Sequence, residues 1–146
     1  MKSLIATFLL ITIFSAAVTA QGFRQQSVGV RGRLLCGNEP TRNTTIKLWD
    51  KNTVGFDKQL ASGRPNPDGT FQINGGTGGL FALDVHIKFY TDCGRSAWLP
   101  CQRKIDLKIP SNYVTRTSDV QQYFDIGSLN FNSLNLRMKI LHALIN

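Results

Sequence analysis

Residues 81–90, FALDVHIKFY, decide the fold of this chain. Apolar side chains occupy every second position from Phe81 to Phe89, and Asp84, His86 and Lys88 stand between them. Because successive side chains of a β-strand point to opposite faces, this period of two predicts a strand. One face of that strand is expected to be buried and the other to meet solvent.

The same alternation recurs in shorter runs on both sides of this stretch. The apolar positions are Val28, Val30, Leu34 and Cys36; Ile46 and Leu48; Phe71 and Ile73; Ile105, Leu107 and Ile109; Phe124 and Ile126. After Gly127 the phase of the last run shifts to Leu129 and Phe131, which predicts a β-bulge. Turn signals at 37–40, 66–69 and 74–79 separate the runs. About seven or eight half-buried strands predict an all-β, antiparallel sandwich.

The first twenty residues are typical of a secretory signal peptide. Lys2 precedes an apolar run from Leu4 to Val18, and small residues follow up to Ala20. That run is shorter than the ~20 residues that span a bilayer, which favours a signal peptide over a membrane anchor. We therefore expect a secreted, extracellular protein with a signal peptide at 1–20, one domain at 21–131 and a tail at 132–146.

Helical patterns are few. From Leu134, apolar residues recur at steps of three and four, at Met138, Leu141 and Ile145. This spacing is typical of an amphipathic helix, and a frayed tail is the alternative. Short helices are also candidates near Trp98 and at 118–122.

The formal net charge is +8, and removal of the signal peptide, which holds Lys2 and no acid, leaves +7. Basic residues are spread along the chain, and Lys47, Lys88, Lys104 and Lys108 fall on outward positions of predicted strands. In a secreted protein this charge favours anionic lipid, sulfated glycans or acidic protein surfaces over nucleic acid. Solubility alone explains the charge equally well.

The chain has three cysteines, Cys36, Cys93 and Cys101, which allow one disulfide in an oxidising compartment. Cys93 and Cys101 bracket a short connection, so we predict that they pair, and closing this loop contributes roughly 2–3 kcal/mol. Cys36 is then a buried thiol or a bridge to another chain. The spacing does not fit a zinc site, and no metal is predicted.

Candidate catalytic groups are sparse. His86 lies between Asp84 and Lys88 on the outward face, where it could serve as a general base. No Ser or Cys stands in a recognisable nucleophile context, and the carboxylates are scattered singly. The glycine-rich run at 75–79 precedes a strand and not a helix, which is typical of a connection and not of a phosphate loop. The sequence thus predicts a binding protein that is not an enzyme and uses no cofactor.

One modification motif is present. Asn43, Thr44 and Thr45 form an N-glycosylation sequon with no proline between them. It precedes the predicted strand at Ile46, where the chain is expected to be exposed. We predict a glycan on Asn43 in a eukaryotic secretory pathway.

Several of these residues together resemble the transthyretin-like proteins of nematodes. The matching segments are Val30–Gly37 with Pro40 and Ile46–Asp50, Asp68–Phe71, Asp92-Cys93, Arg103-Lys104, Ile109-Pro110, Tyr113-Val114 and Phe124–Leu129. Their order and spacing agree over residues 28–131. The resemblance implies a transthyretin-type (prealbumin-like) sandwich of two antiparallel sheets, in agreement with the alternation.

The resemblance implies secretion and three classes of function. Some members resemble extracellular adaptors that link cell-surface lipid to receptors, which implies a binding or signalling role at an anionic lipid, glycan or protein partner. The vertebrate relative carries hormone between subunits, so a carrier of a small apolar ligand is the second hypothesis. A hydroxyisourate-type hydrolase is the third, but this chain lacks the Tyr-Arg-Gly-Ser tail and the paired histidines of that branch.

The chain departs from the family pattern in two places. Family members often have His before the Asp-Cys pair, where this chain has Thr91. They also commonly have a further cysteine near the C-terminus, a natural partner for one near the start. Residues 134–146 contain no cysteine, which on this pattern leaves Cys36 unpaired.

Overall fold

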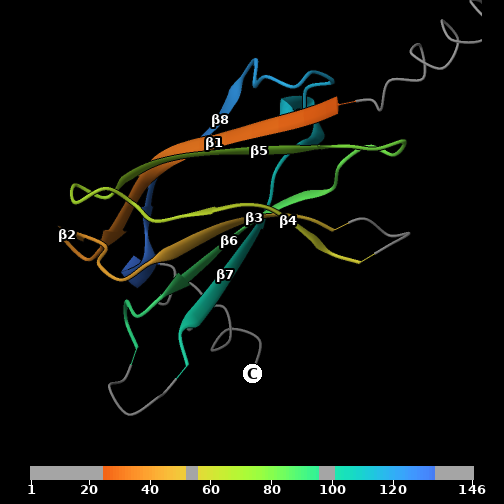
Figure 1. Cartoon of the computed structure of the whole chain (residues 1–146). Helices are drawn as coiled ribbons and strands as arrows, with labels where there is room; N and C mark the ends of the chain where they lie inside the picture. Colours follow the sequence, from red (N-terminus) through yellow and green to blue (C-terminus); the bar gives the residue numbers. More distant parts are fainter. Residues whose placement is uncertain (1–24, 52–55, 96–100, 134–146) are drawn as a thin grey trace, which may run out of the picture.

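The computed structural model describes residues 25–51, 56–95 and 101–133, which form two β-sheets packed face to face (Figure 1). The first sheet consists of β1 (Gln25–Cys36), β2 (Glu39–Pro40), β5 (Thr70–Gly78) and β8 (Tyr123–Asn130). The second sheet has the order β4 (Lys58–Gly63), β3 (Thr45–Asp50), β6 (Val85–Thr91) and β7 (Arg103–Lys108). The predicted all-β sandwich is confirmed.

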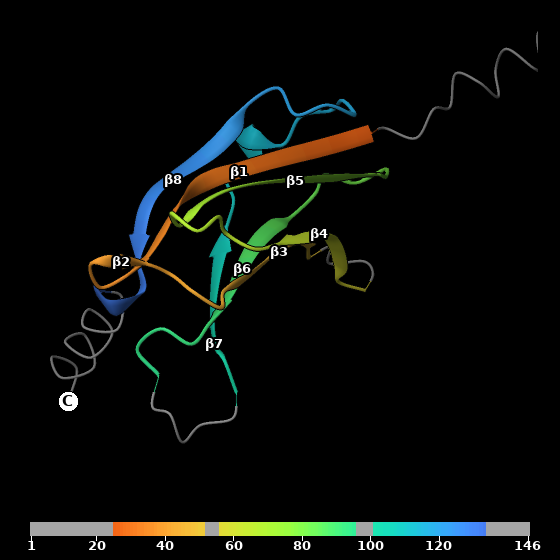
Figure 2. The same cartoon turned by 60° about the vertical axis from the view of Figure 1, so that its left-hand side comes forward.

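The core lies between the two layers, which Figure 2 shows with β8, β1 and β5 above β3 and β6. Its buried side chains are those of the predicted apolar phase: Val28, Val30, Leu34, Ile46, Leu48, Phe71, Ile73, Val85, Ile87 and Phe89. The Phe89 ring lies 5.8 Å from the ring centroids of both Phe71 and Phe131, so one aromatic group links the sheets. Each fully buried side chain of this size contributes about 1.5–3 kcal/mol.

The strand predicted over residues 81–90 begins later than the alternation indicates. Leu83 is buried as predicted, but β6 starts at Val85, and Phe81 lies exposed in the connection from β5. The prediction that Phe81 faces the core is therefore wrong. The strand β4 escaped the sequence analysis because Lys58–Gly63 does not alternate between apolar and polar residues.

The β-bulge predicted after Gly127 is confirmed. In the pairing of β8 with β1, two residues of β8 lie opposite Gly32 alone, and Gly127 has a φ of 65°. A Cβ on Gly32 would lie 2.4 Å from Cγ1 of Ile126, so the bulge needs glycine at this contact. The β1–β8 pair runs parallel, whereas the other described pairs are antiparallel.

In the described ranges, helical structure is limited to a short 3₁₀ turn, η1 (Ser111–Tyr113), and to residues 131–133 after β8. Residues 118–122 form bends and not the helix proposed for them. The candidates near Trp98 and from Leu134 onward lie outside the described residues, as does the signal peptide at 1–20. Within the described ranges, no helix is long and apolar enough to cross a membrane.

The predicted disulfide is wrong: Cys93 pairs with Cys36 and not with Cys101. Cys36 ends β1, and Cys93 follows β6 in the inward phase of Ile87 and Phe89, so the two thiols meet between the sheets. Cys101 is exposed and free. The pairing is therefore decided by the inward positions of Cys36 and Cys93, and not by the short sequence separation of Cys93 and Cys101.

Candidate functional site

The four lysines predicted to contact an anionic surface share one face of the second sheet. Lys47 lies on β3, Lys88 on β6, and Lys104 and Lys108 on β7, all on outward positions. The sequence analysis thus placed them on the correct face. Their environments differ, however, and this determines which of them can meet a partner.

Lys88 is not available to a partner, because its side chain is covered. The residue is only 6% exposed, and its Nζ lies 4.6 Å from the Trp49 ring centroid and 3.9 Å from Oδ2 of Asp57. The Trp49 indole N–H beneath it is buried without a hydrogen-bond partner in the described residues. Lys88 therefore stabilises this face through a cation–π contact.

A network of opposite charges occupies the half of this face near the start of β6. His86 Nδ1 donates to Asp106 Oδ1 at 2.7 Å, and Lys51 Nζ donates to Asp106 Oδ2 at 2.9 Å. Lys108 Nζ lies 2.8 Å from Asp84 Oδ1. Lys108 and His86, both outward as predicted, are thus paired with carboxylates within the chain.

The network also determines the protonation of its central carboxylate. Partial burial raises the pKa of Asp106, but the hydrogen bonds from Lys51 and His86 outweigh it and hold the pKa below its ordinary value. The hydrogen bond to Asp106 in turn raises the pKa of Lys51. The arrangement is that of a structural ion network, in which His86 is held between Asp106 and, at 3.9 Å, Asp84.

The other half of the face carries cations without counterions. Tyr90 pairs with Thr45 on one side and Lys104 on the other, and Lys47 Nζ lies 5.4 Å from the Tyr90 ring centroid. Neither Lys47 nor Lys104 forms an ion pair with any described residue. We call Lys47, Tyr90 and Lys104 the cationic strip.

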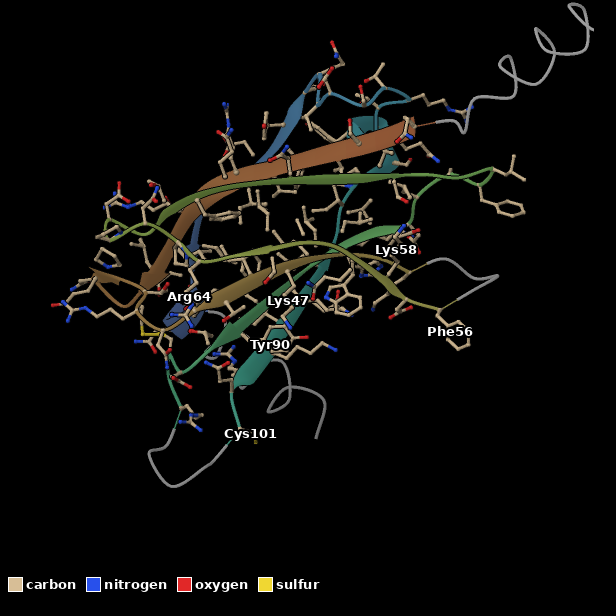
Figure 3. All side chains as sticks on the ribbon, viewed as in Figure 1. Lys47, Phe56, Lys58, Arg64, Tyr90 and Cys101 are labelled. Carbon is tan, nitrogen blue, oxygen red and sulfur yellow. A yellow bond between two sulfur atoms is a disulfide. The ribbon has the colours of Figure 1, made fainter. Side chains whose placement is uncertain are left out.

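Three exposed apolar side chains mark one end of the sandwich. Phe56 is 99% exposed in the β3–β4 connection, and Leu80 and Phe81 are 85% and 58% exposed in the β5–β6 connection. Both connections lie at the same end in Figures 1 and 2, and Figure 3 places Phe56 and Lys58 at that end. We call these three residues the apolar end.

Specific bonds hold the two connections of the apolar end in place. Lys58 Nζ donates to Thr77 Oγ1 at 2.6 Å and so joins the start of β4 to the end of β5. The buried Gln26 side chain donates to the Phe81 carbonyl at 2.7 Å and accepts from the Leu83 N–H at 3.2 Å. The start of β4 and the segment around Phe81 are therefore held in place.

Sequence analysis missed the apolar end because Phe81 continues the alternation of β6 and Phe56 stands alone between strands. The amino-acid composition of the β5–β6 connection could have indicated this site. Leu80 and Phe81 directly follow the glycine-rich run, where a connection is expected to be polar. Large apolar residues in a connection are the signal that could have found this site.

The sequon lies at the opposite end. Asn43 is exposed and has a φ of 53°, and its side-chain amide donates to Asp92. Its backbone carbonyl accepts a hydrogen bond from Gln102 Nε2 at 3.2 Å. Exposure agrees with a modifiable site, and glycosylation itself stays a prediction.

Comparison with known proteins identifies the family of this chain. The profile of the transthyretin-like family matches residues 31–110. The chain belongs to this family. Its relatives include transthyretin-like proteins 46 and 33 of Caenorhabditis elegans, 39% identical over 76% of this chain and 36% identical over 84% of it.

The match covers 63% of the length of transthyretin-like protein 46 and 82% of that of transthyretin-like protein 33. Transthyretin-like protein 5 of the same organism is 36% identical over 70% of this chain and 73% of its own length. The family resemblance inferred from the quoted motifs is thereby confirmed. None of these names assigns a ligand, so function rests on the site geometry.

Proposed function

We propose that this member of the transthyretin-like family is an extracellular binding protein, without enzymatic activity, that docks on anionic lipid surfaces through its apolar end. The observation that carries the proposal is the near-complete exposure of Phe56 and Leu80 at one end of the sandwich, next to segments that hydrogen bonds hold in place. Exposed apolar clusters on soluble domains mark interaction sites, because leaving them in water costs free energy.

The shape of the apolar end favours a bilayer over a flat protein partner. Its side chains are carried on connections and not on a sheet face, so they can enter the boundary between headgroups and acyl chains. Transfer of a fully exposed Phe or Leu side chain out of water contributes about 1.5–3 kcal/mol each. Several such residues together give a useful membrane affinity.

Basic residues beside the apolar end supply the preference for anionic lipid. Lys58 lies two residues after Phe56, and Arg116 lines the same small cavity as Leu80 and Phe81. A basic side chain near an anionic membrane surface contributes about 1 kcal/mol. Asp57 is the neighbouring acid, and its carboxylate lies 3.9 Å from the Lys88 ammonium.

The surroundings of His86 support a binding role over a hydrolase. Its Nδ1 is engaged by Asp106, and Lys51 and Lys108 complete the local charge balance. The cavities at 31–33 with 125–128 and at 41–44 with 64–67 are open and lined mainly by polar residues. The lining of these two cavities does not favour a small apolar ligand.

The test is sedimentation of the secreted protein with vesicles of phosphatidylcholine alone or mixed with phosphatidylserine. We expect binding to the mixed vesicles, at least tenfold weaker binding of the double variant Phe56→Ser/Leu80→Ser, and weaker binding at high salt. Lys58→Gln should weaken binding more than the matched control Lys104→Gln. Unchanged binding of the double variant, or equal binding to neutral vesicles, would contradict the proposal.

A further inference from the structure

A second candidate site lies at the end of the sandwich away from Phe56, where Figure 3 shows Arg64. An open pocket of about 390 Å³ separates the segment 41–44, which precedes β3, from the segment 64–67, which follows β4. Arg42 and Arg64 both line it.

The charge of this pocket is uncompensated. Arg42 and Arg64 form no ion pair with any described residue, and no carboxylate lines the pocket. The neighbouring acid, Asp92, is engaged by the Asn43 amide and lies 3.5 Å from Arg95 Nε. Guanidinium groups bind planar or tetrahedral oxyanions through paired N–H donors, so an anion is the matching ligand.

An independent observation comes from Thr41, which lines the same pocket and is only 4% exposed. Its backbone N–H donates to the Leu34 carbonyl at 3.1 Å, but its hydroxyl is buried without a partner in the described residues. A buried hydroxyl without a hydrogen bond costs about 1–3 kcal/mol, and native structures rarely retain one without a purpose. Rotation of the Thr41 side chain about χ1 would turn this hydroxyl toward the pocket, where a ligand oxygen would supply the missing partner.

The walls of the pocket are preorganised. Pro65 and Pro67 restrict the backbone on one side, and that segment closes through the bond from Asn66 N–H to the Thr70 carbonyl at 2.8 Å. On the other side the buried Thr44 hydroxyl donates to Thr91 Oγ1 at 3.0 Å. A site held in this way loses little conformational entropy when it binds.

The pocket continues into the cationic strip. Arg64 follows Gly63, which pairs with Ile46, so it lies beside Thr45 at the edge of the second sheet. Thr45 pairs with Tyr90, and Tyr90 with Lys104. Three strand spacings of ~4.8 Å make this row about 14 Å long, which suits an extended polyanion with a stacking surface at Tyr90.

We propose that the pocket formed by Thr41, Arg42 and Arg64 binds a sulfate ester of an extracellular glycan, whose next anionic groups lie along the cationic strip. The anion site itself is separate from the apolar end, but the choice of a glycan over a lipid headgroup rests on the proposed function. A bilayer docked on Phe56 faces the opposite end, which favours a glycan over a lipid headgroup as the source of the oxyanion.

Isothermal titration of the secreted protein, with any glycan removed from Asn43, tests the inference. The probes are a sulfated disaccharide, its unsulfated counterpart, inorganic sulfate and glycerophosphoserine. We expect saturable binding of the sulfated disaccharide and at least tenfold weaker binding of the unsulfated one. Equal affinity for the two disaccharides, or tighter binding of glycerophosphoserine, would overturn the assignment.

Variants locate the site. Arg42→Gln and Arg64→Gln should each lower the affinity about tenfold, whereas the matched control Arg31→Gln, on the outer face of the first sheet, should change it less than twofold. Thr41→Val should weaken binding and yet raise the Tm of the free protein, because it removes an unpaired hydroxyl. Equal losses for Arg64→Gln and Arg31→Gln would show a general charge effect and refute the pocket.

Discussion

The side chain of Gln26 in β1 holds the connection that carries Phe81. Its amide donates to the Phe81 carbonyl and accepts from the Leu83 N–H, so one buried residue fixes both sides of Ala82. This pair links the core of the first sheet to the apolar end. It explains how an exposed connection after a glycine-rich run can hold its apolar side chains in one place.

Replacing Gln26 should therefore affect stability and lipid docking together. Gln26→Ala removes both hydrogen bonds and leaves two backbone groups without partners, at a cost of about 1–3 kcal/mol. Urea unfolding measures that cost, and vesicle sedimentation of the folded variant measures docking. Gln72→Ala, an exposed change on β5, is the control and should alter neither. If Gln26→Ala is less stable but still binds lipid fully, the Gln26 hydrogen bonds do not contribute to docking and the prediction is wrong.

The disulfide between Cys36 and Cys93 predicts that replacing either of these cysteines lowers stability far more than replacing Cys101. It closes 57 residues, and the chain-entropy relation gives about 4 kcal/mol for a loop of that length. Cys36→Ser and Cys93→Ser should lower the free energy of unfolding by up to this amount. Cys101→Ser should change it by less than about 0.5 kcal/mol. Peptide mapping without reduction checks the pairing directly, and a Cys93–Cys101 peptide would contradict it.

The ion network around Asp106 predicts how stability depends on pH. The pKa of this carboxyl is lowered from 3.8 in the folded protein, so its contribution is fully present above pH 3.8. That contribution is lost as the pH falls through the folded-state pKa. Asp106→Asn should flatten the acid limb of a plot of Tm against pH, and the exposed Asp119→Asn serves as the control. An unchanged acid limb in Asp106→Asn would argue against the network.

The bulge between β1 and β8 predicts different costs for its two glycines. Gly32→Ala would place a Cβ 2.4 Å from Ile126, whereas a Cβ on Gly127 meets no atom within 4 Å. Gly127→Ala should then cost only the ~1–2 kcal/mol of a positive φ, and Gly127→Asn less than that. Gly32→Ala should cost more, as overpacking does. The ranking by urea unfolding tests the bulge, and the reverse order would contradict it.

The sequence predicted what repeats along the chain and missed what depends on contacts between distant segments. Alternation identified the inward residues of β1, β3, β5 and β6, and the phase shift identified the bulge at Gly127. The parallel pairing of β8 with β1 leaves no local signal. The same holds for β4, whose residues do not alternate, and for the meeting of Cys36 with Cys93.

The candidate sites show the same division. Outward phase placed Lys47, Lys88, Lys104 and Lys108 on one face, but it could not show that Trp49 lies beneath Lys88 or that Asp84 pairs with Lys108. Nor could it bring Arg42 and Arg64, which are separated by the whole β3–β4 hairpin, to one pocket. Local pattern gives the direction of a side chain, and the fold gives its neighbours.

The length of β1 limits the separation of the two proposed sites. Gln26 contacts the Phe81 connection, and Leu34 contacts Thr41 beside the arginine pocket. Eight residues of strand at ~3.3 Å each place these contacts at most about 26 Å apart, because β1 bends between them (Figures 1 and 2). That is about three Debye lengths at physiological ionic strength, where the Debye length is ~8 Å. A molecule seated on an anionic membrane would therefore hold its pocket beyond most of the membrane's surface potential, so that a negatively charged glycan could bind there without being repelled.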